Sequence, residues 1–136
     1  VHDVVGIAPV STGLGYWLAG ADGGVFAFGS ARFEGSLPGD GVAVHDVVGA
    51  VSSGNGYLLV GADGGVFAFG PTHFEGSLPG DGVTIHDVVG IAPVSTGLGY
   101  WLAGADGGVF AFGSARFAGS ADGGLSPGDP VVAIAP

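Results

Sequence analysis

The stretch that decides the fold runs from Gly15 to Ser36 and reads GYWLAGADGGVFAFGSARFEGS. Apolar runs flank Asp22-Gly23, and an Asp-Gly pair between apolar runs is a strong signal for a β-hairpin. Glycine interrupts every segment that could form a helix, and helical periodicity with capping residues is absent. The stretch therefore predicts short β-strands and almost no helix.

Working outward, the same pattern recurs along the chain, as in tandem-repeat proteins. The segment VVGIAP that begins at Val4 returns, with small changes, after 43, 41 and 43 residues. Residues 4–33 and 88–117 are identical, whereas the second repeat has diverged and is two residues shorter in one loop. We interpret the chain as a single repeat domain, 1–136, with repeats at about 1–43, 44–84 and 85–127 and the start of a fourth at 128–136.

Each repeat is expected to form four short strands. In the first repeat these are residues 1–10, 15–22, 24–29 and 31–36. Successive side chains of a strand point to opposite faces, and Tyr16-Trp17-Leu18-Ala19 carries no charge on either face. Such a sheet needs cover on both sides. Sheets stacked around an axis give that cover.

The expected fold is all-β, with tandem four-stranded repeats in a β-propeller-like arrangement of about three blades per chain. Four strands in about 40–45 residues is also the size of one propeller blade. A β-trefoil or β-prism with three-fold pseudo-symmetry is one alternative, and a β-solenoid is another. A closed propeller has about four to eight blades, so three repeats need further repeats to close a ring.

Charge and composition exclude several classes of protein. The 136 residues include 12 acidic residues, two arginines and no lysine, for a net charge of -10, which disfavours nucleic acid and anionic membranes as partners. No apolar run reaches the roughly 18 residues of a membrane helix, so we expect no membrane insertion. Although 31 residues are glycine, 47% are hydrophobic, which argues against disorder. The absence of cysteine excludes disulfides, thiolate metal sites and thiol nucleophiles.

The motifs do not indicate an enzyme, and we assign no catalytic residues. The sequence contains neither a G-x-S-x-G elbow nor an H-E-x-x-H helix, and its glycine-rich segments do not open helices as phosphate loops do. A catalytic site also tends to occur once in a chain, whereas the polar residues here are repeated.

We expect no cofactor and no metal site, with calcium as the alternative. Three aspartates recur in Ala-Asp-Gly-Gly turns, where Asp can bond its own backbone or contribute to a Ca²⁺ site: Asp22, Asp63 and Asp106. Adjacent His-Asp pairs also recur at one strand start: His2-Asp3, His45-Asp46 and His86-Asp87. Neighbours on a strand point to opposite faces, so one such pair cannot chelate an ion.

The stretch that begins at Gly15 resembles a tandem repeat of secreted and cell-surface proteins of actinobacteria, of the form GYWLVASDGGVFAFGDA. The motifs GYW, DGGVFAFG and F-x-GS match in register, and the resemblance covers nearly the whole chain, three times over. The second repeat departs from it at Leu58 and Pro71. Members of this family are often attached to cell-wall or glycan-active enzymes and are thought of as propeller-like. The resemblance therefore implies an extracellular or cell-surface accessory module.

Eight residues are candidates for contact with a ligand. Five are aromatic residues that can stack on sugar rings or else form the core: Tyr16, Trp17, Tyr57, Tyr100 and Trp101. Three occupy one equivalent position in the repeats, each before a phenylalanine: Arg32, His73 and Arg116. These can contact a ligand or a neighbouring subunit. The alternative for Arg32 is a surface ion pair with Glu34.

We expect a non-catalytic extracellular module that binds cell-wall or other glycans. The alternative is a structural or assembly module that pairs with other chains and has no small-molecule ligand. The first strand type occurs four times and the others three times, so the terminal sheets are expected to expose apolar faces. We predict a head-to-tail C2 homodimer of six blades, clasped by residues 131–136, or cover by covalent neighbours in a longer chain.

Overall fold

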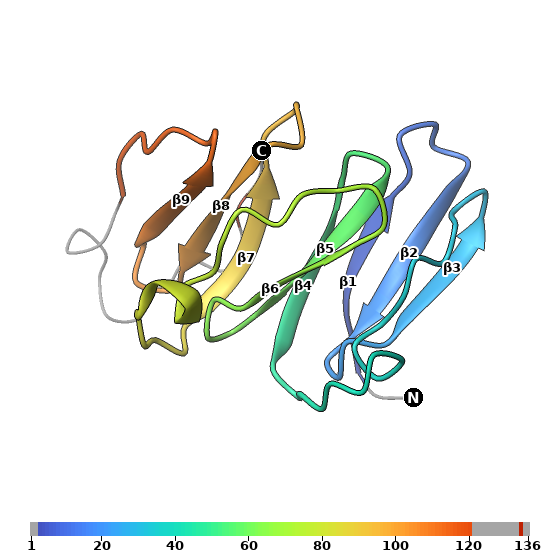
Figure 1. Ribbon diagram of the computed structural model, residues 1–136, viewed down its shortest axis with the longest axis horizontal. Helices are drawn as coiled ribbons and strands as arrows, with labels where there is room; N and C mark the ends of the chain where they lie inside the picture. The colour runs from blue at the N-terminus through green and yellow to red at the C-terminus, as the bar shows by residue number, and fades with distance from the viewer. Residues whose placement is uncertain (1–2, 121–133, 135–136) are drawn as a thin grey trace.

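The computed structural model describes residues 3–120 and 134. It contains three antiparallel sheets of three strands each, with the strand orders β1-β2-β3, β4-β5-β6 and β7-β8-β9 (Figure 1). We refer to them as sheets 1, 2 and 3. The strands are β1 Val4–Pro9, β2 Gly15–Gly20, β3 Val25–Gly29, β4 Val47–Ser53, β5 Gly56–Gly61, β6 Val66–Phe69, β7 Val88–Pro93, β8 Gly99–Gly104 and β9 Val109–Gly113. The described residues otherwise contain only a three-residue 3-10 helix, η1 Pro79–Asp81, so the all-β prediction is confirmed.

The predicted hairpin between the second and third strand of each repeat is confirmed. At the first turn, the Gly20 N–H donates to the Gly24 carbonyl at 2.9 Å, and the Gly24 N–H donates to Oδ1 of Asp22 at 2.8 Å. Gly23 has a φ of 83°, in the left-handed region that favours glycine. The aspartate itself does not adopt positive φ, because among the described residues only glycines do.

The predicted fourth strand of each repeat is wrong. Residues 31–36, 72–77 and 115–120 belong to no strand. Several of their backbone groups bond to side chains instead of to a neighbouring strand. The carbonyl of Arg32 accepts from Nε1 of Trp17 at 2.7 Å, and the Glu34 N–H donates to the Tyr57 hydroxyl at 3.0 Å. The segment thus bridges sheets 1 and 2 rather than extending sheet 1.

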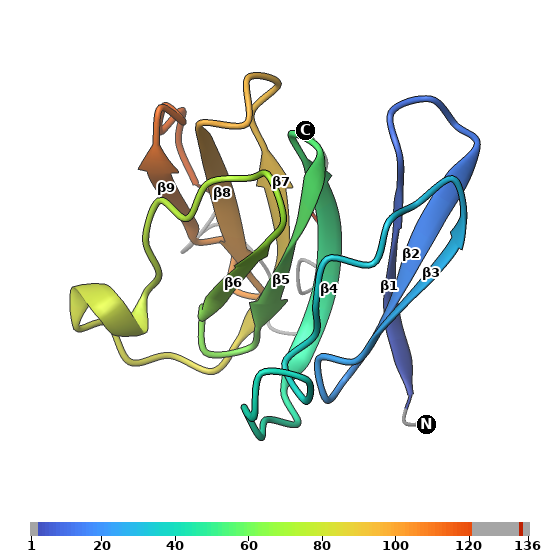
Figure 2. The same cartoon turned by 45° about the vertical axis from the view of Figure 1, so that its right-hand side comes forward.

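The three sheets lie side by side in chain order and face one another (Figures 1 and 2). They come closest at their first strands, β1, β4 and β7. One apolar cluster lies between sheets 1 and 2 and includes Trp17 and Tyr57. A second lies between sheets 2 and 3 and includes Leu58 and Tyr100. Strand β5, in the middle sheet, is buried over its whole length. Sheet 2, in the middle of the molecule, is therefore covered on both faces, as the sequence predicts for these strands.

Three separate sheets fit both the propeller-like and the three-fold alternatives that the sequence leaves open. The expected start of a fourth repeat, 128–136, lies outside the described residues except for Ile134. A Cβ atom at Gly90 would lie 3.6 Å from the backbone nitrogen of Ile134, and one at Gly6 would lie 2.8 Å from that of Ala50. Ile134 therefore lies beside β7 in the way that Ala50 of β4 lies beside β1.

Candidate functional site

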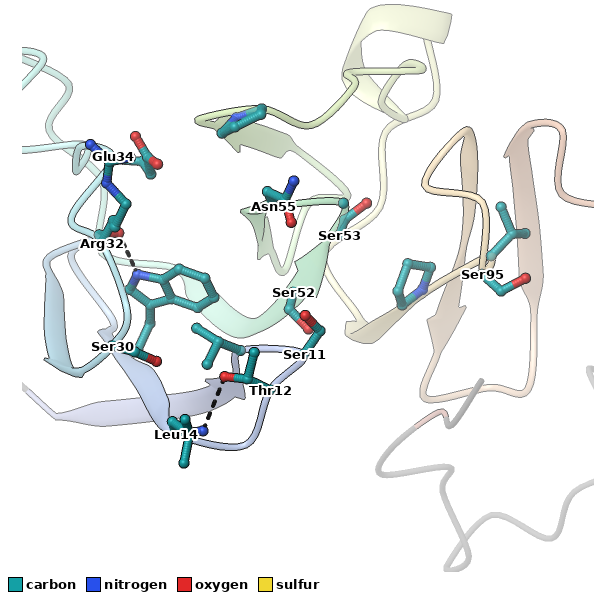
Figure 3. Close-up of a pocket in the computed structure, with 16 residues that line it drawn as sticks. Ser11, Thr12, Leu14, Ser30, Arg32, Glu34, Ser52, Ser53, Asn55 and Ser95 are labelled. Atoms are coloured by element: carbon teal, nitrogen blue, oxygen red, sulfur yellow. Dashed lines mark hydrogen bonds between the residues drawn. The ribbon is translucent and has the colours of Figure 1, made fainter.

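A groove of about 820 Å³ lies where loops from all three repeats converge (Figure 3). Its lining comes from the β1–β2 loop around Ser11, the β4–β5 loop around Asn55 and the start of the β7–β8 loop with Ser95. Residues Ser30 to Glu34, which follow β3, form a further wall. Because each repeat contributes different positions to the lining, the groove is a composite site rather than one of three equal sites.

The lining is rich in side chains that form hydrogen bonds without carrying a net charge. Hydroxyl and amide groups both donate and accept, which suits a ligand with many hydroxyls. In Figure 3, Arg32 and Glu34 lie together on one side, with Asn55 across the groove from them. The hydroxyl and amide residues of the lining are Ser11, Thr12, Ser30, Ser52, Ser53, Asn55 and Ser95.

The wall that carries Arg32 is held by aromatic side chains beneath it. Trp17, which also lines the groove, binds the Arg32 carbonyl, and the Tyr57 hydroxyl accepts from Glu34 N–H and donates to the Gly35 carbonyl. The rings of Trp17 and Tyr57 are in contact, with centroids 4.9 Å apart. These bonds fix the backbone of the wall while the Arg32 side chain stays exposed.

The ion pair that the sequence suggests between Arg32 and Glu34 is not formed in the described part of the chain. That prediction assumes a strand, in which residues two apart share a face, and residues 31–36 are not a strand. Instead, the Glu34 side chain packs over the next sheet, since a Cβ atom at Gly70 would lie 2.7 Å from its Cγ.

The predicted aromatic residues divide into enclosed and exposed ones. Tyr57, Tyr100 and Trp17 are buried between sheets, as the core interpretation of these residues expects. Trp101 is partly buried, and Tyr16 is exposed on the outer face of sheet 1. Adjacent Tyr and Trp side chains lie on opposite faces, as the sequence predicts, because Trp17 belongs to the cluster with sheet 2 and Tyr16 does not.

The three predicted basic positions are all exposed, but the groove includes only one of them. Arg32 lines it, whereas His73 and Arg116 are absent from its lining. Of the eight predicted ligand contacts, the structure brings Trp17 and Arg32 together in this groove.

Sequence reasoning missed a set of exposed aromatic side chains, Phe33, Phe74 and Phe117. Phe74 belongs to the middle repeat, which has a sheet on either side, and it is still 57% exposed. Its exposure therefore belongs to the repeat itself and does not depend on a missing neighbour. The signal was present in the sequence, since each of these residues directly follows a predicted basic position.

Burial raises the pKa of the Tyr57 and Tyr100 hydroxyls above 10.0, with desolvation as the largest cause. The charges of Glu34 and Glu75 add to this effect, while hydrogen bonds with the backbone oppose it. Both hydroxyls therefore stay neutral at physiological pH and can donate and accept at the same time. This is what their two backbone partners require.

The repeated acids have structural partners at the turns. Oδ1 of Asp22, Asp63 and Asp106 each accepts the N–H of the glycine two residues on at 2.8 Å. His45-Asp46 and His86-Asp87 directly precede β4 and β7. Within residues 3–120, three or more potential metal ligands do not gather at any point. Nor does this part of the chain contain a helix long and apolar enough to cross a membrane.

Comparison with protein-family models and with curated proteins finds no match to the chain. The resemblance to actinobacterial surface repeats therefore stays a prediction from the motifs quoted above.

Proposed function

We propose that the chain is a non-catalytic extracellular repeat module that binds a cell-wall or other glycan in the groove. The observation that carries the proposal is the composition of the groove: seven hydroxyl or amide side chains, contributed by all three repeats, with one basic and one acidic residue at the edge. A concave site with convergent polar groups is the usual place for a small ligand.

The chemistry of the lining favours an uncharged sugar. Sugar hydroxyls donate and accept, as do the Ser, Thr and Asn side chains that they would meet. Arg32 can donate to a ring or hydroxyl oxygen, and Glu34 can accept from a hydroxyl. The chain carries a net charge of -10, which disfavours strongly anionic polymers.

An exposed aromatic ring in the same segment supports the same proposal. Phe33 lies between Arg32 and Glu34 in sequence and is exposed, although the groove lining does not include it. Aromatic faces pack well on the C–H-rich faces of sugar rings. Phe74 and Phe117 repeat this feature on the following repeats, so a long glycan would gain further weak contacts.

The experiment is a glycan array followed by calorimetry with the best ligand. Arg32→Ala and Asn55→Ala are expected to weaken binding about tenfold each, the effect of losing one or two hydrogen bonds. Arg116→Ala is the matched control, because Arg116 has the same preceding residues as Arg32 but does not line the groove. Selective binding that Arg32→Ala weakens and Arg116→Ala leaves unchanged supports the proposal. Failure to bind any neutral glycan, or equal loss in the two arginine variants, overturns it.

A further inference from the structure

The outer face of sheet 1 is an apolar surface that its counterpart in sheet 3 buries. The two sheets share residues 4–33 and 88–117. Ile7 is 60% exposed and Ile91 4%; Tyr16 is 42% exposed and Tyr100 1%; Phe28 is 43% exposed and Phe112 7%. Sheet 2 covers the second member of each pair. The sequence of this face is therefore that of an internal packing surface.

Within the chain, the contact that this face makes with the preceding sheet occurs twice. The Tyr57 hydroxyl is held by the N–H of Glu34 and the carbonyl of Gly35, and the Tyr100 hydroxyl is held by the N–H of Glu75 and the carbonyl of Gly76. Each tyrosine therefore binds the segment that follows the third strand of the preceding sheet. We call this two-residue backbone arrangement the tyrosine clamp.

The third repeat presents the same clamp at Ala118-Gly119. Gly119 has a φ of 121°, close to the 126° of Gly35 and the 125° of Gly76. A Cβ atom at Gly35 would lie 3.0 Å from Cδ1 of Phe69, and one at Gly76 would lie 3.1 Å from Cδ1 of Phe112. A Cβ atom at Gly119 would have no heavy atom of the described residues within 4 Å, apart from its own chain neighbours. The backbone at Ala118-Gly119 therefore has the conformation of the two occupied clamps, although no described sheet packs against it.

We propose that the outer face of sheet 1 docks on sheet 3 of a second copy of this chain. The Tyr16 hydroxyl accepts from the Ala118 N–H of the second copy and donates to its Gly119 carbonyl. The Tyr16 ring packs on Trp101 of the second copy, which reproduces the contact of Trp17 with Tyr57 at 4.9 Å. One chain carries both halves of the contact, the tyrosine face on sheet 1 and the clamp after sheet 3.

Docking places strand β1 of one copy beside Gly90 of the other, at the position that Ile134 holds in the single chain. The sequence that contains Ile134, VVAIAP, resembles the VVGIAP of β1, so Ile134 and β1 compete for one position. With Ile134 in place, Trp101 is still partly exposed. A whole three-stranded sheet covers more apolar surface than Ile134 does and displaces it.

Two such contacts, related by a two-fold axis, join two chains of three sheets into a closed ring of six. Rings of about four to eight sheets are the range in which propellers close. Head-to-tail contacts that close in this way give a defined dimer rather than a filament.

The test is the mass of the full chain by light scattering over a dilution series. We expect about 26 kDa, twice the 13.0 kDa of one chain. Ile7→Glu places a charge in the proposed contact and is expected to give a monomer. Val42→Glu is the control, because Val42 is exposed and lies outside this face. Tyr16→Phe is expected to raise the dissociation constant of the dimer about tenfold, the effect of losing the clamp bonds.

A 13.0 kDa monomer at every concentration overturns the proposal and leaves the face to another repeat or to the chain's own terminal segment. Equal dissociation by Ile7→Glu and Val42→Glu also overturns it. Larger oligomers that only Ile7→Glu dissolves support the contact but overturn the closed ring. Because no ligand is present, the outcome is independent of glycan binding.

Discussion

Repeats one and three contain the same residues in different surroundings. Residues 88–117 pack against sheet 2 through their tyrosine face, whereas residues 4–33 present that face to solvent. The stacking within each sheet is nearly the same: Tyr16 lies 5.4 Å from Phe28 and Tyr100 lies 5.6 Å from Phe112, measured between ring centroids. Identical sequences thus form the same local structure, and the neighbouring sheet decides which side chains become core.

The largest expected difference between sheets 1 and 3 comes from truncating the equivalent phenylalanine in each. Phe112→Ala is expected to lower the free energy of unfolding by about 3–5 kcal/mol, since it leaves a cavity between sheets 2 and 3. Phe28→Ala is expected to cost about 1 kcal/mol, because Phe28 is exposed in a single chain. Urea titration measures both in an Ile7→Glu background, which keeps sheet 1 uncovered. Equal losses would mean that sheet 1 is covered even in the single chain.

The hairpin turn gives the next largest effect. Gly23→Val is expected to destabilise the fold by about 3 kcal/mol, because Gly23 has positive φ and a Cβ atom there would lie 2.5 Å from Cδ1 of Leu37. Asp22→Ala removes one hydrogen bond and is expected to cost about 1 kcal/mol. Thermal unfolding of the two variants checks the order. If Asp22→Ala proved the more damaging, the turn would depend on the carboxylate rather than on the backbone.

The repeats, the hairpins and the absence of long helices could be predicted from the sequence because they depend on local residues. The fate of ARFEGS, residues 31–36, could not, because its partners are Trp17 and Tyr57, which are distant in sequence. In the sequence alone, this short segment has the pattern of a strand. Only the three-dimensional structure shows that its backbone bonds to side chains instead of to another strand. The groove was missed for a similar reason: its polar residues lie in loops and at the end of β4, and these segments meet only once the sheets stack.

The tyrosine clamp gives a smaller contrast between the same two repeats. Tyr100→Phe is expected to cost about 1–3 kcal/mol, because the Glu75 N–H and the Gly76 carbonyl lose a buried partner. In a monomeric background, Tyr16→Phe is expected to change stability by less than about 0.5 kcal/mol. Chemical denaturation of the two variants measures the difference. A similar cost for both would contradict the assignment of Tyr16 as unclamped in the single chain.

The pH dependence of stability gives the smallest expected effect. It is negligible near neutral pH and grows in alkali. The pKa values of Tyr57 and Tyr100 are raised above 10.0 in the folded state, so the unfolded chain loses these protons first. Their contribution to stability is fully present below about pH 10 and is lost as the pH rises through the folded-state values. Denaturant midpoints from neutral pH into alkali check this. Tyr100→Phe should lose less stability over that range than the unmodified chain.

Amide hydrogen exchange by NMR tests the docking of sheet on sheet most directly. The N–H groups of Glu34 and Glu75 are held by tyrosine hydroxyls within the chain and serve as internal standards. At concentrations where the dimer forms, the Ala118 N–H is predicted to be protected as they are, and Tyr16→Phe is predicted to remove that protection alone. Rapid exchange at Ala118, with Glu34 and Glu75 protected, would contradict the docking of sheet 1 on sheet 3 of a second copy.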